Sequence, residues 1–473
     1  MTEKSIGACG AAALQGHTGP WRVELREMLR LAAPIVFTQL AWVAMLSTDT
    51  AMMGHLGPVP LAGAALAGMV FFLGHVFCFG IVTATAGLAA QAYGARKPRL
   101  VRRVIRQGLW VTIAISVPAV LAFGFLPEIL TLLDQPAEAI PAADAYMTVL
   151  KWSLPFGVGC AVVRKFVSAL NRPAVALWVM LCAVPLNALL DYALIFGNFG
   201  APRLEMFGAG LATAIVNAVM FAALLVIALT GRRFARYSIL GRFWRPDWHQ
   251  FGQIFAIGLP IAGTLILEAG FFIAAGFVMG KFGSASLAAH MIAMQLPHIT
   301  FMVPMGMAQA ATVRVGHAVG RRNPAAVHRA GWVAMGLTLA FMSAATVIIL
   351  SIPEYFAAIF LDGARADSAA VLALATTFLL YAAFFQVVDG MQAVAAGALR
   401  GLNDTAVPMV LAAVSYWIVG AAAGLWLAFG VGMDGRGLWL GFLFGLSSAA
   451  LMLTWRFYRL ARAGYLPAMR ANI

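Results

Sequence analysis

The stretch LAAPIVFTQLAWVAMLSTDTAMMGHLG (residues 31–57) is apolar over more than the ~20 residues that a helix needs to cross a bilayer. Some of its residues recur at a constant spacing of 226 residues: Pro34 corresponds to Pro260, and MGHLG (53–57) corresponds to MGKFG (279–283). The same spacing continues through the pairs Gly94–Gly320, Pro98–Pro324 and Arg103–Arg329. A register kept over about seventy residues predicts an internal repeat of two helices and a basic loop.

The composition predicts an integral membrane protein. The 473 residues are 62% hydrophobic and 11% charged, and the mean hydropathy is +0.88. A soluble protein of this length needs far more charge on its surface. Apolar segments bounded by Gly, Pro or charge predict twelve helices, at residues 31–53, 60–92, 104–126, 143–170, 174–197, 206–230, 251–280, 286–316, 327–350, 369–399, 406–430 and 437–461.

Lysine and arginine concentrate on one side of these helices, around residues 96–106, 232–245, 321–329 and 456–462. The loops on the other side hold mainly Asp and Glu. Cytoplasmic loops carry an excess of Lys and Arg, so both termini are expected in the cytoplasm. This topology accounts for the net charge of +14, and no nucleic-acid partner is expected.

The repeat also predicts the domain organisation. An even number of helices separates the two copies, so both insert in the same direction and form parallel six-helix lobes around a central cleft. The expected order is a cytoplasmic N-terminal segment, an N-lobe, a basic cytoplasmic linker, a C-lobe and a cytoplasmic tail, at residues 1–30, 31–230, 231–250, 251–461 and 462–473.

Four carboxylates lie inside the expected helices: Asp49, Asp191, Glu268 and Asp389. Each charged residue at mid-membrane costs about 2.5–3.5 kcal/mol on insertion scales. One interpretation is structural, with each acid paired to a remote basic residue or facing a water-filled vestibule. The functional interpretation is a group that binds a cation or takes a proton during transport.

The repeat does not copy these acids, because Asp49 aligns with Ala275. Each lobe therefore has its own set. In the N-lobe, Asn187 and Asp191 are four residues apart and share one face of a helix. Together with Asp49 and Thr213 they supply four oxygen-bearing side chains, which suits a hard cation or a proton.

Enzyme signatures are absent. The sequence contains no GxxxxGK[ST], HExxH or GxSxG motif. We expect neither an enzyme nor an ATP-driven pump, and no cofactor beyond a coupling ion.

The chain resembles the multidrug and toxic compound extrusion (MATE) family, in its bacterial NorM-like branch. The resemblance rests on residues 31–57 and on AAQAYGARKPR, GLPIAGTLILEAGFF, AAHMIAMQLPHITFMVPMGMAQAATVRVG and VVDGMQAVAAGALRGLND. It implies a monomer in the bacterial inner membrane, in contact with membrane lipid, whose two lobes form a V with alternating access. It also implies antiport of small cationic or amphipathic drugs against sodium ions or protons.

The resemblance assigns roles to individual residues. It implies an N-lobe cation or proton site at Asp49, Asn187, Asp191 and Thr213. It implies a C-lobe cation or drug site at Glu268 and Asp389, and bending of the first helix at Pro34. A sodium ion is a candidate ligand at either acid cluster. The family pattern includes a tyrosine where this chain has Phe385, so a hydroxyl is expected to be missing from the C-lobe site.

The main alternative is a lipid-linked precursor flippase of the same superfamily, which would need a basic central cavity. The intramembrane acids favour a cationic cargo instead. Arg164 and Lys165 lie near a helix end and are expected to reach the lipid headgroups. A hydrolase or an ion channel is a weaker alternative, because the sequence has no nucleophile–base set and no filter repeat.

Overall fold

The computed structural model describes residues 19–359 and 368–466, and within these ranges its regular secondary structure consists of helices. Residues 1–18 and 467–473, which belong to the expected N-terminal segment and tail, lie outside the described residues. The first helix of the described residues begins at Pro20, earlier than the expected Leu31, and Pro fits the first turn of a helix, where no backbone N–H is needed.

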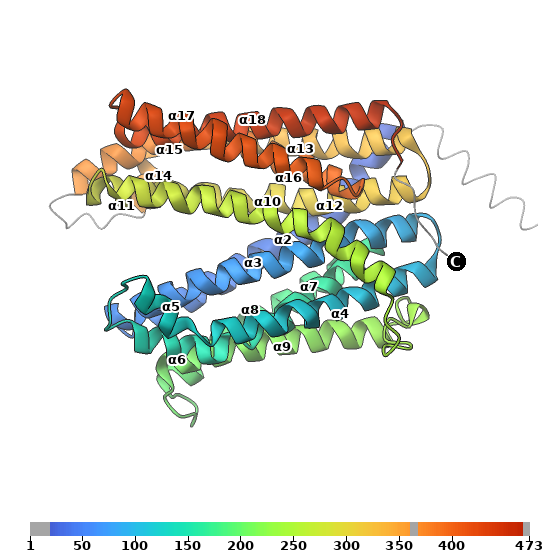
Figure 1. Cartoon of the computed structure of the whole chain (residues 1–473), viewed down its shortest axis with the longest axis horizontal. Helices are drawn as coiled ribbons and strands as arrows, with labels where there is room; N and C mark the ends of the chain where they lie inside the picture. The colour runs from blue at the N-terminus through green and yellow to red at the C-terminus, as the bar shows by residue number, and fades with distance from the viewer. Residues whose placement is uncertain (1–18, 360–367, 467–473) are drawn as a thin grey trace, which may run out of the picture.

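The N-lobe contains α2 (Pro20–Gly54), α3 (Pro58–Gly94), α4 (Pro98–Phe123), α5 (Leu126–Leu132), α6 (Ile140–Leu150), α7 (Ser153–Ala169), α8 (Ala174–Phe196) and α9 (Glu205–Thr230). After η2 (Ala235–Tyr237), the C-lobe contains α10 (Trp248–Gly280), α11 (Ser284–Thr300), α12 (Met302–Gly320), α13 (Pro324–Ser351), α14 (Pro353–Ile359), α15 (Ser368–Gly401), α16 (Ala406–Ala413), η3 (Val414–Ala421), α17 (Ala422–Leu425), η4 (Trp426–Gly430) and α18 (Asp434–Arg462). In Figure 1 most of the first group (blue to green) lies below most of the second (yellow to red), and α10 crosses from the upper group to the lower right.

Within the described residues, eleven helices are long and apolar enough to cross a membrane. The pair α6 and α7, bent by 45° at a short break, makes twelve if it counts as one span. The all-α, two-lobe membrane fold expected from the sequence is therefore confirmed. Some expected helices are not continuous: 143–170 is broken between α6 and α7, and 286–316 is divided at Phe301 between α11 and α12.

The internal repeat is visible in the backbone dihedral angles. Residues matched by the 226-residue spacing share a positive φ, at +113° and +100° for Gly57 and Gly283 and at 58° and 55° for Arg96 and Arg322. Further along the chain the spacing lengthens by six residues to 232, and Asn171 and Asn403 both have φ of 58°. Non-glycine residues seldom adopt this region. The shared exceptions confirm that the two halves turn at equivalent places.

The lobes meet at the end of the bundle that carries the basic loops 95–97, 231–247 and 321–323, which we call the basic end. Here glycines pack against the backbone of the other lobe, with Gly94 of α3 against His317 of α12. Gln91 donates from Nε2 to the carbonyl oxygen of Gly401 (2.9 Å) and accepts from Asn403 Nδ2 (2.9 Å). Toward the opposite end the two groups of helices diverge in Figure 1.

Candidate functional site

The four predicted N-lobe residues come together. Asp49 lies on α2, and the side chains of Asn187 and Asp191 on α8 and of Thr213 on α9 adjoin its carboxylate. Asp49 is 6% exposed, Asn187 1% and Asp191 0%. The spacing of four residues places Asn187 and Asp191 on one face of α8, as predicted. We call these four residues the N-lobe cluster.

The N-lobe cluster contains more acceptors than donors. Among the described residues, no hydrogen-bond donor reaches Asp49 Oδ1, Asn187 Oδ1 or either carboxylate oxygen of Asp191. The Thr213 hydroxyl donates to the carbonyl oxygen of Ala209 (3.1 Å), so its proton is also directed away from the acids. Buried acceptors without a donor are costly unless a cation or a proton compensates them. The arrangement can therefore hold a hard cation or a shared proton.

Tyr146 of α6 belongs to this neighbourhood and was not predicted from the sequence. It is buried, and its phenol lies close enough to Asp49 and Asp191 to interact with both charges. Its backbone packs against Gly210 of α9, where an added Cβ would lie 2.6 Å from the Tyr146 carbonyl oxygen. No local motif marks this tyrosine, because its contacts come from distant helices.

In the C-lobe, Gln392 joins the two predicted acids. Its Nε2 donates to Glu268 Oε1 (2.8 Å) and to Asp389 Oδ1 (3.2 Å). Its Oε1 accepts from the Tyr416 hydroxyl (2.6 Å). Tyr416, Gln392 and Asp389 are all buried. We call these four residues the C-lobe network.

The expected loss of a hydroxyl from this lobe needs correction. Phe385 is buried among aromatic rings, with its ring centroid 5.6 Å from that of Trp439. The hydroxyl enters instead from Tyr416 on η3, a helix that lies side by side with α18 and α10. A hydroxyl is thus present in the C-lobe, although it is bonded to Gln392 and not directly to an acid.

Pro34 lies inside α2, and its carbonyl oxygen accepts from the Thr38 hydroxyl (2.7 Å). The repeat copies this feature in α10, where Thr264 donates to Pro260 (2.9 Å). Both threonines line the same cavity between the lobes. Proline has no N–H to bond the carbonyl one turn earlier, so each helix lacks one backbone bond beside the cavity.

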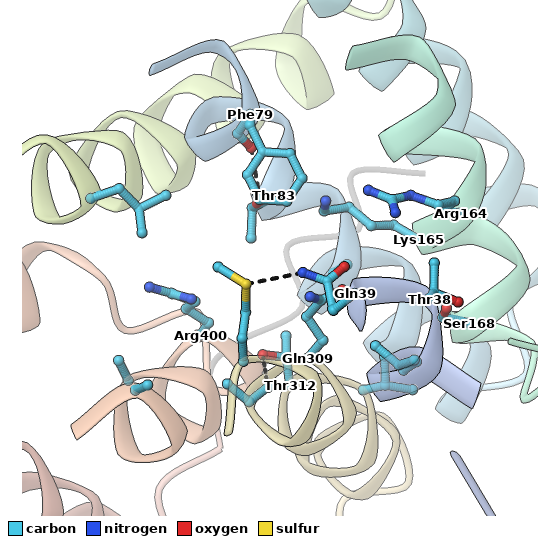
Figure 2. A pocket seen from close by; sticks show the side chains of 18 of the residues that line it. Thr38, Gln39, Phe79, Thr83, Arg164, Lys165, Ser168, Gln309, Thr312 and Arg400 are labelled. Atoms are coloured by element: carbon cyan, nitrogen blue, oxygen red, sulfur yellow. Dashed lines mark hydrogen bonds between the residues drawn. The ribbon is translucent and has the colours of Figure 1, made fainter. Parts of the chain in front are cut away.

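The central cavity has a volume of about 110 Å³ and is bounded by both lobes (Figure 2). Glu268 and Gln392 line it, so the C-lobe network borders the cavity, whereas no residue of the N-lobe cluster does. The two acid sites therefore differ in their access to a bound molecule.

The cavity also corrects the prediction for the basic residues. Arg164 and Lys165 of α7 line the cavity and do not reach for headgroups, and Arg400 of α15 joins them. Arg400 is also close enough to Glu268 for a Coulombic attraction, so a basic residue does neutralise part of one intramembrane acid. The environment of Arg164 and Lys165 depends on which helices cover their faces of α7. The sequence of one helix does not show which neighbour covers which face.

A family model and proteins of known sequence match this chain over most of its length. The MatE family model matches residues 34–193 and 260–426, one segment in each lobe. A protein of Mesorhizobium japonicum named "Probable multidrug resistance protein NorM" is 44% identical over 445 residues, which are 93% of this chain and 95% of that protein. A protein of the same name from Rhodopseudomonas palustris is 43% identical over 100% of this chain and 99% of its own length.

Solved structures share the fold at lower identity. A multidrug resistance MATE transporter in an outward-facing conformation has a TM-score of 0.84 and 19% identity, and covers 93% of this chain and 96% of its own. The eukaryotic MATE transporter AtDTX14 has a TM-score of 0.82 and 20% identity over 94% of this chain and 98% of its own.

Proposed function

This chain belongs to the MatE family, and on that premise we propose that it exports small cationic or amphipathic drugs by antiport against sodium ions or protons. It is a multi-pass membrane transporter of the multidrug-efflux class and not an enzyme. Antiport, the coupling ion and the residue roles below are our proposal.

The observation that carries the proposal is that the N-lobe cluster has too few hydrogen-bond donors for its acceptor oxygens. Four buried acceptor oxygens without a donor form a site that a proton or a sodium ion would stabilise. The ion is a transported substrate here and not a resident cofactor. Its binding can shift the equilibrium between two lobe arrangements only through its different affinity for each.

We propose that the C-lobe network receives the cationic part of the drug, because Glu268 borders the cavity. Ion entry at either acid site removes negative charge and weakens the attraction for a cationic drug. The lobe contact at the basic end fits a closed gate on the cytoplasmic side of the inner membrane, with both termini on that side. Pro34, with one backbone bond missing, is the proposed point of bending in α2.

The test is efflux of ethidium from proteoliposomes that contain the purified chain, with sodium and proton gradients imposed separately. We expect Asp49→Asn and Asp389→Asn each to reduce gradient-driven efflux about tenfold or more. Asp134→Asn, at an exposed loop acid, is the matched control and should leave efflux unchanged. Full coupled efflux by the Asp49→Asn/Asp389→Asn double variant would contradict the proposal.

One observation favours the second candidate, a lipid-linked precursor flippase. The cavity contains three cationic side chains, Arg164, Lys165 and Arg400, which a pyrophosphate would bind. Rescue of a flippase-deficient strain, without any gain of drug tolerance in a drug-sensitive strain, would place this candidate first.

A further inference from the structure

The central cavity has an uneven distribution of charge. Lys165 on α7 and Arg400 on α15 reach into it from opposite walls, and Arg164 extends beside Lys165 (Figure 2). Glu268 is the single carboxylate residue in the lining, so the cations exceed the acids by two. The other polar side chains of the lining are neutral.

Arg164 and Lys165 have no carboxylate beside them in the cavity lining, whereas Arg400 interacts with Glu268. None of the three takes part in a salt bridge within 4.0 Å in the described part of the chain. Lys165 is 7% exposed, and its Nζ lies 4.1 Å from the centroid of the Phe79 ring. An ammonium group has three donors and a guanidinium has five, and all three side chains line the cavity, where a bound anion could accept from them.

Arg400 occupies a middle position. It is close enough to interact with Glu268 on one side and with Lys165 on the other. An elongated molecule in the cavity would thus meet a carboxylate near one end and a pair of cations near the other. The apolar lining between them includes Phe79, Phe301 and Met305, which suits a flat or flexible apolar body.

A purely structural reading is that these cations only complement the C-terminus of α7. Lys165 lies four residues before Ala169, and a cation in the last turn of a helix is worth about 0.3–1 kcal/mol. That reading does not explain the geometry. Adjacent residues on a helix point in different directions, yet Arg164 and Lys165 both line this cavity, and Arg400 approaches from the other lobe. Three like charges that converge repel one another unless an anion lies between them.

We infer that the central cavity contains an oxyanion subsite formed by Arg164, Lys165 and Arg400, which binds the carboxylate of a zwitterionic amphipathic substrate. The amine of the same molecule faces Glu268, and its apolar body lies along the wall between them. The inference rests on the proposed export function and deepens it by specifying the charge pattern of the cargo.

The test compares two probes with the same cationic, apolar body: rhodamine B, which carries a free carboxylate, and its ethyl ester, in which an ethyl group removes that charge. Binding to the purified chain in nanodiscs is measured by fluorescence anisotropy, and efflux from proteoliposomes gives KM and kcat. The variants are Lys165→Gln and Arg164→Gln. Lys97→Gln, in an exposed loop at the basic end, is the control for the same chemical change outside the cavity.

We expect the wild type and Lys97→Gln to bind the acid about tenfold more tightly than the ester, as a charge-assisted hydrogen bond would give. Each cavity variant should lose that preference, with an acid KM raised about tenfold and an ester KM nearly unchanged. Because the ratio of acid to ester is measured on one preparation, a loss of folded protein does not mimic the result.

Equal binding of acid and ester to the wild type would overturn the inference, as would equal losses for both probes in the variants. The anisotropy measurement decides the inference even if no gradient drives efflux of either probe, an outcome that would count against the proposed function alone. Competition by inorganic pyrophosphate with higher affinity than rhodamine B would replace the zwitterion with a polyanionic cargo.

Discussion

Arg314 of α12 binds Glu24 of α2 through two hydrogen bonds, 2.8 Å from Nε and 2.7 Å from the terminal nitrogen Nη2, so a nearly buried ion pair joins the two lobes at the basic end. Removing one partner of such a pair leaves an uncompensated charge. We expect Glu24→Gln to lower the free energy of unfolding by about 1–3 kcal/mol. Glu27, 3.9 Å from Arg314, limits the loss.

The measurement is thermal unfolding of the purified chain in detergent. Glu205→Gln is the matched control, because it breaks the exposed Arg203–Glu205 pair, whose atoms are 3.2 Å apart. Exposed pairs contribute little, so this control should leave the Tm nearly unchanged. Equal Tm values for the two variants would show that the pair between the lobes does not stabilise the closed arrangement.

A second ion pair predicts a pH dependence. Asp247, in the linker before α10, is partly buried, which raises its pKa, but the hydrogen bond from Arg103 and the backbone N–H of Gln250 outweigh burial and hold the pKa below its usual range. A carboxylate with a lowered pKa stabilises the fold above the unfolded pKa of about 3.9. This stability is lost as the pH falls through the lower, folded value.

Thermal unfolding at a series of pH values between about 6 and 3 tests this expectation. Asp247→Asn keeps a side-chain acceptor for the helix N-terminus but removes the charge, so it should flatten the acid limb of the stability curve. Asn323→Ala is the control, because Asn323 caps α13 through the N–H of Ala326 (3.0 Å) without a charge. It should lower stability by about 1 kcal/mol at every pH.

The fold and the candidate site differ in how far the sequence predicts them. Helix positions follow from local apolarity, and the 226-residue spacing of Pro34 and Pro260 establishes the two lobes without any structure. Gln392 could have been found, because it lies three residues after Asp389 and so shares its helical face. Tyr146 and Tyr416 could not, since only packing between distant helices brings them to the acids.

The basic residues of the cavity show most clearly what the sequence alone does not predict. A cation near a helix end usually extends to the headgroups, and that rule predicts the wrong environment for Lys165. Its burial depends on helices from elsewhere in the chain, among them α3, whose Phe79 ring lies 4.1 Å from Lys165 Nζ. Nothing within the sequence of α7 contains this information.

The hydroxyl of Tyr416 gives a prediction for the C-lobe network. Tyr416→Phe removes the donor to Gln392 Oε1 and leaves that buried oxygen without a partner among the described residues. We expect a loss of about 1–3 kcal/mol in the free energy of unfolding. The side-chain amide of Gln392 can then rotate, so that its NH2 group no longer points to both Glu268 and Asp389.

The measurement combines denaturation with ethidium efflux at fixed gradient. Tyr458→Phe is the control, because that exposed hydroxyl, near the basic end, bonds only Arg462 (3.1 Å) in the described chain. If the network positions the acids, Tyr416→Phe should raise the KM for ethidium several-fold beyond what Tyr458→Phe does. Loss of stability with an unchanged KM would make the hydroxyl a structural feature only.

The glycines at the contact between the lobes give the last prediction. A Cβ at Gly94 or Gly320 would overlap the backbone of the other lobe, at His317 and at Gln91 respectively. Backbone cannot move aside as a flexible side chain can, so Gly94→Ala and Gly320→Ala should hold the lobes apart at the basic end. Gly336→Ala in α13 is the control, since its Cβ meets nothing within 4 Å. It should be neutral or slightly stabilising, because Ala favours a helix over Gly by about 1 kcal/mol.

The measurement is cysteine labelling in a cysteine-free background with a single cysteine at the cavity residue Ser168. A membrane-impermeant maleimide applied from the basic end should react several-fold faster in the two interface variants than in the control. Identical labelling rates would mean that the lobes close at this end without the glycine contacts.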